Sequence, residues 1–294
     1  MPDLHDEQEI FRTRVGAVWL ERDFLVVDGP DSLKFLQGQL SQDIDLAVGA
    51  SAWSFLLQPQ GKVVALLRIT RLAADTFLLD TDGGWGDAMQ ERLSRFKLRV
   101  KATIEGRPWR CLGLRGPAAH DFRDADLALD ADWPGLVGVD LVGDDPQPPT
   151  GVPLCSRDAY EAVRIEAGIP MMGRELDERT IPAEAGVVDR TVSFTKGCYT
   201  GQELVARIDS RGGNVPRHLQ GVVVKGDVVP PVGAEVKVEG KNVGVLTSVA
   251  TSFARQAPVA LAFVGRAVSA PADVVVEWDG GSAPARVEPL PLVP

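Results

Sequence analysis

The sequence has little of what most catalytic and nucleic-acid-binding proteins require. Its 294 residues include three cysteines, three histidines and two tyrosines, and acidic residues outnumber basic ones to give a net charge of −10. This acidic balance disfavours direct binding of nucleic acid, because neutralising phosphates requires clustered Lys and Arg. The longest apolar runs, such as 63–67, are far too short to cross a bilayer. Neither nucleic acid nor a membrane is therefore expected as a direct partner.

The sparse cysteines exclude further classes. Cys111, Cys155 and Cys198 lie far apart, so no pair has the spacing of a metal clip, and an odd number does not suggest a disulfide framework. No resident metal is expected. Free thiols suit a reducing compartment, and the acidic, polar N-terminus does not resemble a signal peptide. We expect a cytoplasmic protein.

Common catalytic signatures are missing too. The sequence has no G-x-G-x-x-G after a strand, no H-E-x-x-H and no serine nucleophile elbow, which argues against the common dehydrogenase, hydrolase and kinase classes. The phrase Asp80-Thr-Asp-Gly-Gly84 lacks the ligand spacing of a calcium loop and the Gly-Lys-Ser/Thr of a phosphate loop. We interpret it as a turn between a strand and a helix, with Asp82 as the helix cap.

Hydrophobic patterning predicts an α+β protein with a β-rich tail. The front part alternates predicted strands at 24–28, 53–57, 62–70 and 76–80 with helices near 31–40 and 85–98. A further helix is expected at 156–167. After Pro216 the chain becomes a series of short β-runs separated by hairpin turns at 239–242 and 279–282. Strands at this spacing favour a small antiparallel barrel as a separate C-terminal domain.

What chemistry the chain does contain is concentrated in Lys196-Gly-Cys-Tyr-Thr-Gly-Gln-Glu203. Lys196, Arg207 and the N-terminus of a following helix would all favour the thiolate form of Cys198, which predicts a lowered pKa. Cys198 could then be a reactive thiolate, a persulfide carrier or a ligand to a metal cluster. The alternative is a small apolar residue filling a gap at a helix start. A Cys–His nucleophile is poorly supported, since only His218 is near in sequence.

Glu184 is a second candidate, in the small-residue loop Ile181-Pro-Ala-Glu-Ala-Gly186. A carboxylate can accept two parallel hydrogen bonds from a ring that presents adjacent N–H and amino donors, as a pterin or guanine does. The alternative is a solvated acidic loop residue.

Taken together, these phrases resemble the YgfZ family, folate-binding relatives of the glycine-cleavage T-protein, an aminomethyltransferase. The resemblance is specific at 196–203, continues through Arg207 and Arg211, and covers the region from about residue 25 to residue 220. It also includes Phe35-Leu-Gln-Gly-Gln39 with Asp43, Pro59-Gln-Gly-Lys62, Arg95-Phe-Lys-Leu-Arg99 and Pro182-Ala-Glu-Ala-Gly186. The tail matches only in being β-rich.

The resemblance implies a three-lobed T-protein-like fold around a channel that holds tetrahydrofolate. Residues 1–48 and 106–215 would form a discontinuous folate-binding α+β lobe, 49–105 a second α+β lobe, and 216–294 the barrel. Glu184 would bind the pterin ring. Cys198 with Lys196 would be the functional thiol site, and the remaining folate-binding positions would be Tyr199, Gln202, Arg207 and Arg211.

The resemblance also implies a function. YgfZ-like proteins are associated with the assembly or repair of iron–sulfur clusters in selected enzymes, including those that thiolate tRNA, so the expected partners are folate and iron–sulfur client or assembly proteins. The first alternative is a folate-dependent one-carbon (aminomethyl) transferase of the T-protein type, which requires Asp80 or Asp82 to handle protons at the folate. The T-protein aspartate for this step has no secure match here. A second alternative, a sarcosine-oxidase-like demethylase module, requires a separate flavin-bearing chain.

Overall fold

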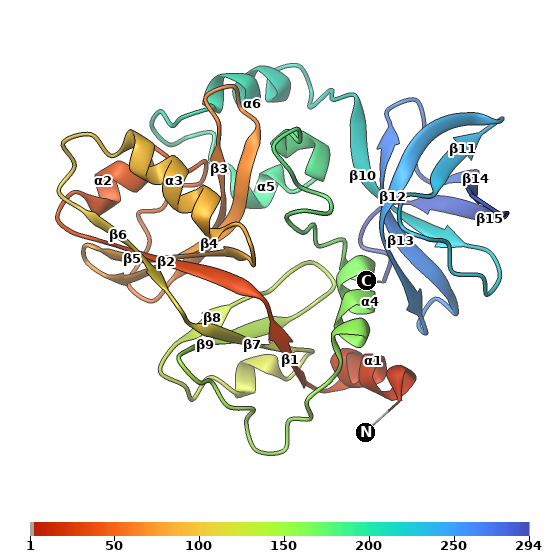
Figure 1. The fold of residues 1–294 in the computed structure, drawn as a ribbon, viewed down its shortest axis with the longest axis horizontal. Coiled ribbons are helices and arrows are strands. Elements are labelled where there is room, and N and C mark those ends of the chain that lie inside the picture. Colours follow the sequence, from red (N-terminus) through yellow and green to blue (C-terminus); the bar gives the residue numbers. More distant parts are fainter. Residues whose placement is uncertain (1–2, 294) are drawn as a thin grey trace. The chain divides into compact units, whose positions relative to one another are not determined.

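A computed structural model describes residues 3–293 (Figure 1). The chain forms two compact units, each assembled from separate segments. The first unit comprises the described residues up to Leu20, Cys111–Pro170 and those from Pro216 onward. The second comprises Glu21–Arg110 and Met171–Val215. Every predicted site residue belongs to the second unit.

The second unit is built on a five-stranded antiparallel sheet in the order β3-β4-β5-β2-β6. Its strands are β2 (Arg22–Asp28), β3 (Ser51–Leu57), β4 (Val63–Ala73), β5 (Thr76–Asp82) and β6 (Thr103–Arg107). Alternate apolar residues of these strands form one core with the helices α2 (Ser32–Gln37) and α3 (Gly86–Phe96). The strands and helices predicted in this region are confirmed, with ends shifted by a few residues.

The later segment of the second unit is short and mostly irregular. It contributes the 3-10 helix η2 (Pro182–Ala185), a single helical turn α5 (Val188–Thr191) and the helix α6 (Gln202–Asp209). Gly201 is the N-cap of α6, and its φ of 87° lies in the left-handed region that glycine favours. The predicted helix after the Cys198 phrase is therefore present.

The first unit contains a four-stranded sheet in the order β1-β7-β9-β8. The strands are β1 (Gly16–Leu20), β7 (Arg110–Arg115), β8 (Ala128–Asp130) and β9 (Gly138–Gly143), with α1 (Leu4–Thr13), η1 (Ala119–Asp121) and α4 (Arg157–Ala167) in the same unit. Ser156 caps α4 by accepting a hydrogen bond from the N–H of Ala159, and Gly168 ends it in the left-handed conformation. The predicted helix at 156–167 is confirmed.

The C-terminal part of the first unit is a closed antiparallel barrel in the order β10-β13-β12-β11-β14-β15 (Figure 1). Its strands are β10 (Arg217–Val224), β11 (Glu235–Val238), β12 (Lys241–Ser252), β13 (Ala257–Gly265), β14 (Ala272–Trp278) and β15 (Gly281–Glu288). Valines and alanines from all six fill the interior. At the hairpin turns, Glu239, Gly240 and Gly280 adopt the left-handed region that short hairpin loops use.

The α+β fold with a C-terminal antiparallel barrel is thus confirmed. The predicted lobe boundaries at residues 48 and 105 stay a prediction, although β2, which precedes residue 49, is hydrogen-bonded between β5 and β6. Within residues 3–293, no helix has both the length and the apolar character needed to cross a membrane.

The second unit's core should dominate its stability. Leu56 on β3 is fully buried in this core, whereas Leu98 is 80% exposed. Leu56→Ala should lower the free energy of unfolding by about 2 to 5 kcal/mol, because it removes buried methyl groups and leaves a cavity. Leu98→Ala, the same chemical change at the surface, should alter it by less than about 0.5 kcal/mol. Urea unfolding of both variants measures the difference, and equal effects would contradict this assignment of the core.

Candidate functional site

The predicted motif around Cys198 forms a loop, here called the signature loop (residues 196–202), that packs against two other polar segments of the second unit. The N–H of Thr200 donates to the carbonyl of Gly38 at 3.1 Å, which joins the loop to the segment after α2. A Cβ on Gly201 would lie 2.6 Å from the carbonyl oxygen of Gln58. Only glycine permits this approach at the observed φ.

The turn between β3 and β4 completes this packing. Gly61 donates its N–H to the carbonyl of Gln58 at 2.8 Å, and a Cβ on Gly61 would lie 2.6 Å from the Cβ of Leu204 on α6. The turn therefore sits directly against the start of α6. Three of the phrases that carry the family resemblance, at 35–43, 59–62 and 196–203, are brought together by these contacts.

Lys196 binds backbone rather than the thiol. Its Nζ donates to the carbonyl oxygens of Leu40 at 2.8 Å and Gln42 at 2.7 Å, and lies 5.5 Å from the centre of the Tyr199 ring. Partial burial lowers the pKa of Lys196 to about 8, and the nearby carboxylate of Asp43 only partly offsets this effect. Lys196 thus anchors the signature loop to the segment after α2.

Tyr199 and Gln202 also stabilise the loop internally. Tyr199 is buried, and burial raises the pKa of its phenol to about 12. The side-chain oxygen of Gln202 accepts the backbone N–H of Tyr199 at 3.1 Å. The structure gives both residues a role in loop geometry, and their predicted contact with folate stays a prediction.

Cys198 is exposed, whereas Cys111 and Cys155 are buried. Burial raises the pKa of Cys155 to about 11, which keeps that thiol protonated and unreactive. The interpretation of Cys198 as a small residue filling an apolar gap is therefore wrong. The two cations expected to activate it are engaged elsewhere, since Lys196 binds carbonyls and Arg207 pairs with Glu203. The predicted thiolate stays a prediction.

The two predicted arginines lie on the solvent side of this region. Arg207 is about half exposed and forms its ion pair with Glu203 one helical turn earlier on α6. Arg211 follows the end of α6 and is exposed. Both guanidinium groups are accessible to an anionic ligand.

Glu184 is buried rather than solvated, with 6% of its surface exposed. It lies in η2, where its Oε2 accepts the backbone N–H of Ile181 at 3.3 Å. The alternative interpretation as a solvated loop residue is therefore wrong. A buried carboxylate has the acceptor chemistry that a pterin edge requires.

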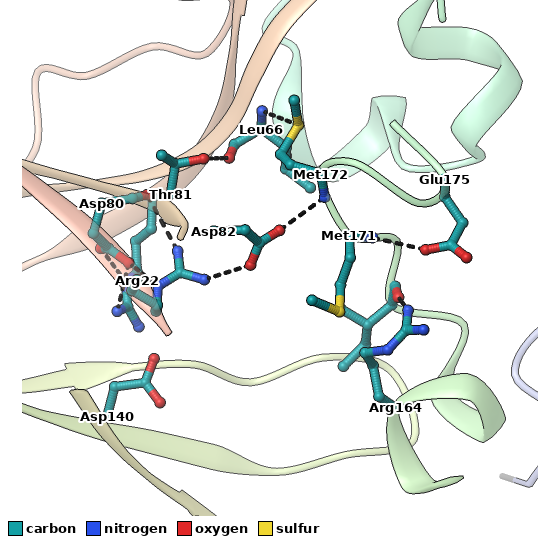
Figure 2. Close-up of polar contacts among 12 residues, drawn as sticks. Arg22, Leu66, Asp80, Thr81, Asp82, Asp140, Arg164, Met171, Met172 and Glu175 are labelled. Carbon is teal, nitrogen blue, oxygen red and sulfur yellow. Dashed lines mark hydrogen bonds and ion pairs between the residues drawn. The ribbon is translucent and has the colours of Figure 1, made fainter. Parts of the chain in front are cut away.

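Asp80 and Asp82, which a transferase would require for proton handling, are both engaged in ion pairs (Figure 2). Asp80 is fully buried, and its two oxygens accept hydrogen bonds from Arg22 Nε at 2.5 Å and from Arg68 Nε and Nη2 at 2.9 and 3.1 Å. Two guanidinium groups stabilise the ionised carboxylate and occupy its oxygens. Asp80 is therefore unsuited to act as a general base.

Asp82 does not cap a helix, so that prediction is wrong. Its carboxylate accepts from Arg22 Nη1 at 3.1 Å and from the backbone N–H of Met172 at 2.9 Å (Figure 2). The first turn of α3 is bonded instead by Asp23, whose Oδ2 accepts the N–H of Gly86 at 2.7 Å. Asp82 thereby connects the sheet to the second segment of the unit.

The arginines that hold Asp80 were not predicted from the sequence. Arg68 is a charged residue inside the otherwise apolar run of β4, and a charge there requires a buried partner. The β4–β5 register places it directly opposite Asp80. A lone arginine in an apolar strand predicts a buried acidic partner. Only the register of β4 and β5 shows that this partner is Asp80.

A second carboxylate was also missed, in the first unit. Glu166 on α4 is 3% exposed and pairs through Oε2 with Arg12, whereas its Oε1 has no hydrogen-bond partner among residues 3–293. Both residues line a cavity of about 360 Å³ with Phe11, Leu136 and Val163. This cavity lies in the range of small-molecule sites.

The environment of Lys196 predicts unusual amine chemistry. Trace labelling with acetic anhydride between pH 6 and 11 should give a half-point near pH 8 for Lys196, because burial disfavours the ammonium form and the neutral amine is the nucleophile. Acetyl-lysine amide in the same reaction serves as the standard. Mass spectrometry follows both, and a Lys196 profile that coincides with the standard would contradict the assigned environment.

Comparison with known families agrees with this architecture. Residues 4–132 match the family described as GCVT N-terminal domain. Residues 217–294 match the one described as Glycine cleavage T-protein C-terminal barrel domain. The second match coincides with the closed barrel of the structure.

Several curated proteins are similar over much of the chain. An aminomethyltransferase of Streptomyces avermitilis is 28% identical, with 98% of this chain and 88% of that protein aligned. An uncharacterized protein of Haemophilus influenzae is 28% identical over 64% of this chain and 66% of that protein. The iron-sulfur cluster assembly factor IBA57 homolog, mitochondrial, of Chaetomium globosum is 28% identical over 65% of this chain. Only 52% of that protein is covered, about half its length.

Among solved structures, glycine cleavage system aminomethyltransferase T from Bartonella henselae shares the fold. It superimposes with a TM-score of 0.82 at 21% identity, over 99% of this chain and 89% of that one. The two domains are matched in chain order over more than half of the sequence, and the fold agrees with them. The chain therefore combines, in order, the two domain types of glycine-cleavage T-proteins: the GCVT N-terminal domain and the C-terminal barrel domain.

Proposed function

We propose that this protein is a tetrahydrofolate-binding accessory protein of the YgfZ type, which supports the assembly or repair of iron–sulfur clusters in selected enzymes. The observation that carries the proposal is the exposed Cys198, which lies on a loop anchored by Lys196 to the segment after α2 and braced by Gln202. An exposed thiol on a well-anchored loop suits exchange of sulfur or a cluster with a partner protein. Cytoplasmic location is part of the proposal.

The folate component rests on Glu184 and the two accessible arginines. Glu184 supplies a buried carboxylate for the adjacent N–H and amino donors of a pterin. Arg207 and Arg211 supply positive charge for the anionic glutamate tail. Bound tetrahydrofolate would supply a carrier for one-carbon units, and the chain's own residues would orient it.

The iron–sulfur component rests on the relative from Chaetomium globosum and on the thiol. That relative is named as an iron–sulfur cluster assembly factor homolog. The cluster or persulfide would be cargo handled by Cys198 rather than a resident group. With a net charge of −10, any link to tRNA thiolation would pass through the thiolating enzymes and not through direct RNA binding.

The alternative, a folate-dependent aminomethyltransferase, is favoured by the overall similarity to enzymes of that name. The environment of Asp80 weighs against it. A carboxylate that is fully buried between Arg22 and Arg68 has no oxygen to offer a substrate proton. Asp82 is likewise committed to Arg22 and Met172.

Titration with tetrahydrofolate and folinic acid tests the folate site. Glu184→Gln should weaken folate binding about 10- to 100-fold, because it removes a hydrogen bond to a charged group and a loss of that size is typical of such a bond. The substitution keeps an oxygen that can accept the N–H of Ile181, so the local fold should survive. Glu91→Gln is the matched control: Glu91 is exposed on α3 of the same unit, and this variant should bind folate as the wild type does.

The same titration discriminates the remaining outcomes. Absence of saturable binding by the wild type would refute the folate component. If Glu166→Gln rather than Glu184→Gln weakened binding, the pterin carboxylate would instead be the one beside the cavity of the first unit.

The role of the thiol is tested in cells that depend on the protein. Cys198→Ala should lower the activity of iron–sulfur enzymes toward that of a deletion strain, while folate binding and thermal stability of the purified variant stay unchanged. Cys155→Ala removes a buried thiol and serves as the control. If iron–sulfur enzymes keep full activity in cells that carry Cys198→Ala, Cys198 has no role in the proposed function.

A further inference from the structure

A cavity of about 230 Å³ lies within the second unit, beside the helix that follows the signature loop. Its walls come from η2, from the start of α5 and from one face of α6. The apolar wall residues are Pro182, Ala183, Val188, Leu204, Val205 and Ile208. The folate and thiol functions proposed above use none of these side chains.

The rim of this cavity is both aromatic and acidic. Phe194 lines it and is 48% exposed, so its ring is available to a partner. Asp189 and Asp209 line it as well, and both are exposed. Neither carboxylate has a hydrogen bond or ion pair among residues 3–293. An apolar hollow bounded by two unpaired negative charges is complementary to an apolar group flanked by positive ones.

The dimensions favour a protein segment as the occupant. Small-molecule sites usually have volumes of about 300 to 1,000 Å³, and this cavity is smaller. A hollow of this size with an exposed aromatic at its rim is the kind of pocket in which one anchor side chain of a partner is buried.

We propose that this cavity is a docking site for a partner protein, which inserts one apolar side chain flanked by Lys or Arg. The proposal rests on the proposed function, because it gives the thiol a partner. Phe194 precedes Cys198 by four residues, so their Cα atoms are at most about 14 Å apart. A segment anchored at Phe194 is thereby held within reach of Cys198, which makes the cavity the element that selects the client.

The experiment uses two short peptides as probes of the complete protein. Acetyl-Arg-Leu-Phe-Arg amide and acetyl-Glu-Leu-Phe-Glu amide share their apolar residues and differ in charge. Titration of the basic peptide should shift the amide resonances of Gly186, Val205 and Gly213 saturably in ¹H–¹⁵N spectra. The acidic peptide should leave them unshifted, because Asp189 and Asp209 repel it.

Two variants test the charges and the anchor. Replacing both aspartates, Asp189→Asn with Asp209→Asn, should weaken the basic peptide about 2- to 25-fold at low salt, the range for two accessible ion pairs. The pair Asp75→Asn with Asp87→Asn, also exposed in this unit, is the matched control and should bind as the wild type does. Phe194→Ala should weaken binding of the basic peptide both in the wild type and in the variant that lacks the two rim aspartates. It should leave folate binding unchanged.

Equal binding of both peptides, or unaltered binding by the Asp189/Asp209 variant, would overturn the proposal. Shifts confined to other parts of the protein would do the same. These outcomes are independent of folate, so they are distinguishable from a failure of the proposed function. If the wild type binds the basic peptide but not folate, only the folate component is refuted. If it binds folate but not the peptide, only the docking site is refuted.

Discussion

The contact on which the candidate site depends is the close backbone approach between Gly201 and the turn that begins at Gln58. A Cβ on Gly201 would lie 2.6 Å from the carbonyl oxygen of Gln58, which is too close. Position 201 therefore requires glycine for space as well as for its positive φ. The approach fixes where α6 begins, and α6 carries Arg207 and one wall of the small cavity. The geometry of the signature loop therefore follows from close packing between two backbone segments.

Charged residues in this unit serve structure more than chemistry. Lys196 satisfies two carbonyls of an irregular segment, and Asp80 is held between two arginines inside the sheet. Removing one member of such a buried pair leaves an uncompensated charge, which is strongly destabilising. The groups that remain accessible are a thiol, arginines and surface carboxylates. This division is the physical basis of the proposed exchange with partner proteins.

The elements of the fold were largely predictable, because alternating and helical apolar patterns are local properties. The strands β3, β4 and β5 and the helix α3 were identified in this way. Partners distant in sequence were not. Asp82 was assigned as a cap because it precedes α3, yet Asp23, from a different strand, bonds that helix. The glycines and Lys196 carried the resemblance to a family in the sequence, but their contacts with residues 38–61 follow only from the fold.

The discontinuous make-up of the second unit also governs when the thiol site can form. Its sheet is encoded before residue 111, whereas the signature loop and α6 belong to a segment that begins at Met171, after a long stretch of the other unit. Synthesis proceeds from the N-terminus at about 5 to 20 residues per second. The sheet is therefore synthesised several seconds before the segment that packs against it. During that interval the turn at Gln58–Gly61 lacks α6, and a nascent chain is left without a presented Cys198. The loop that carries Cys198 therefore reaches its folded position only in chains that are nearly complete.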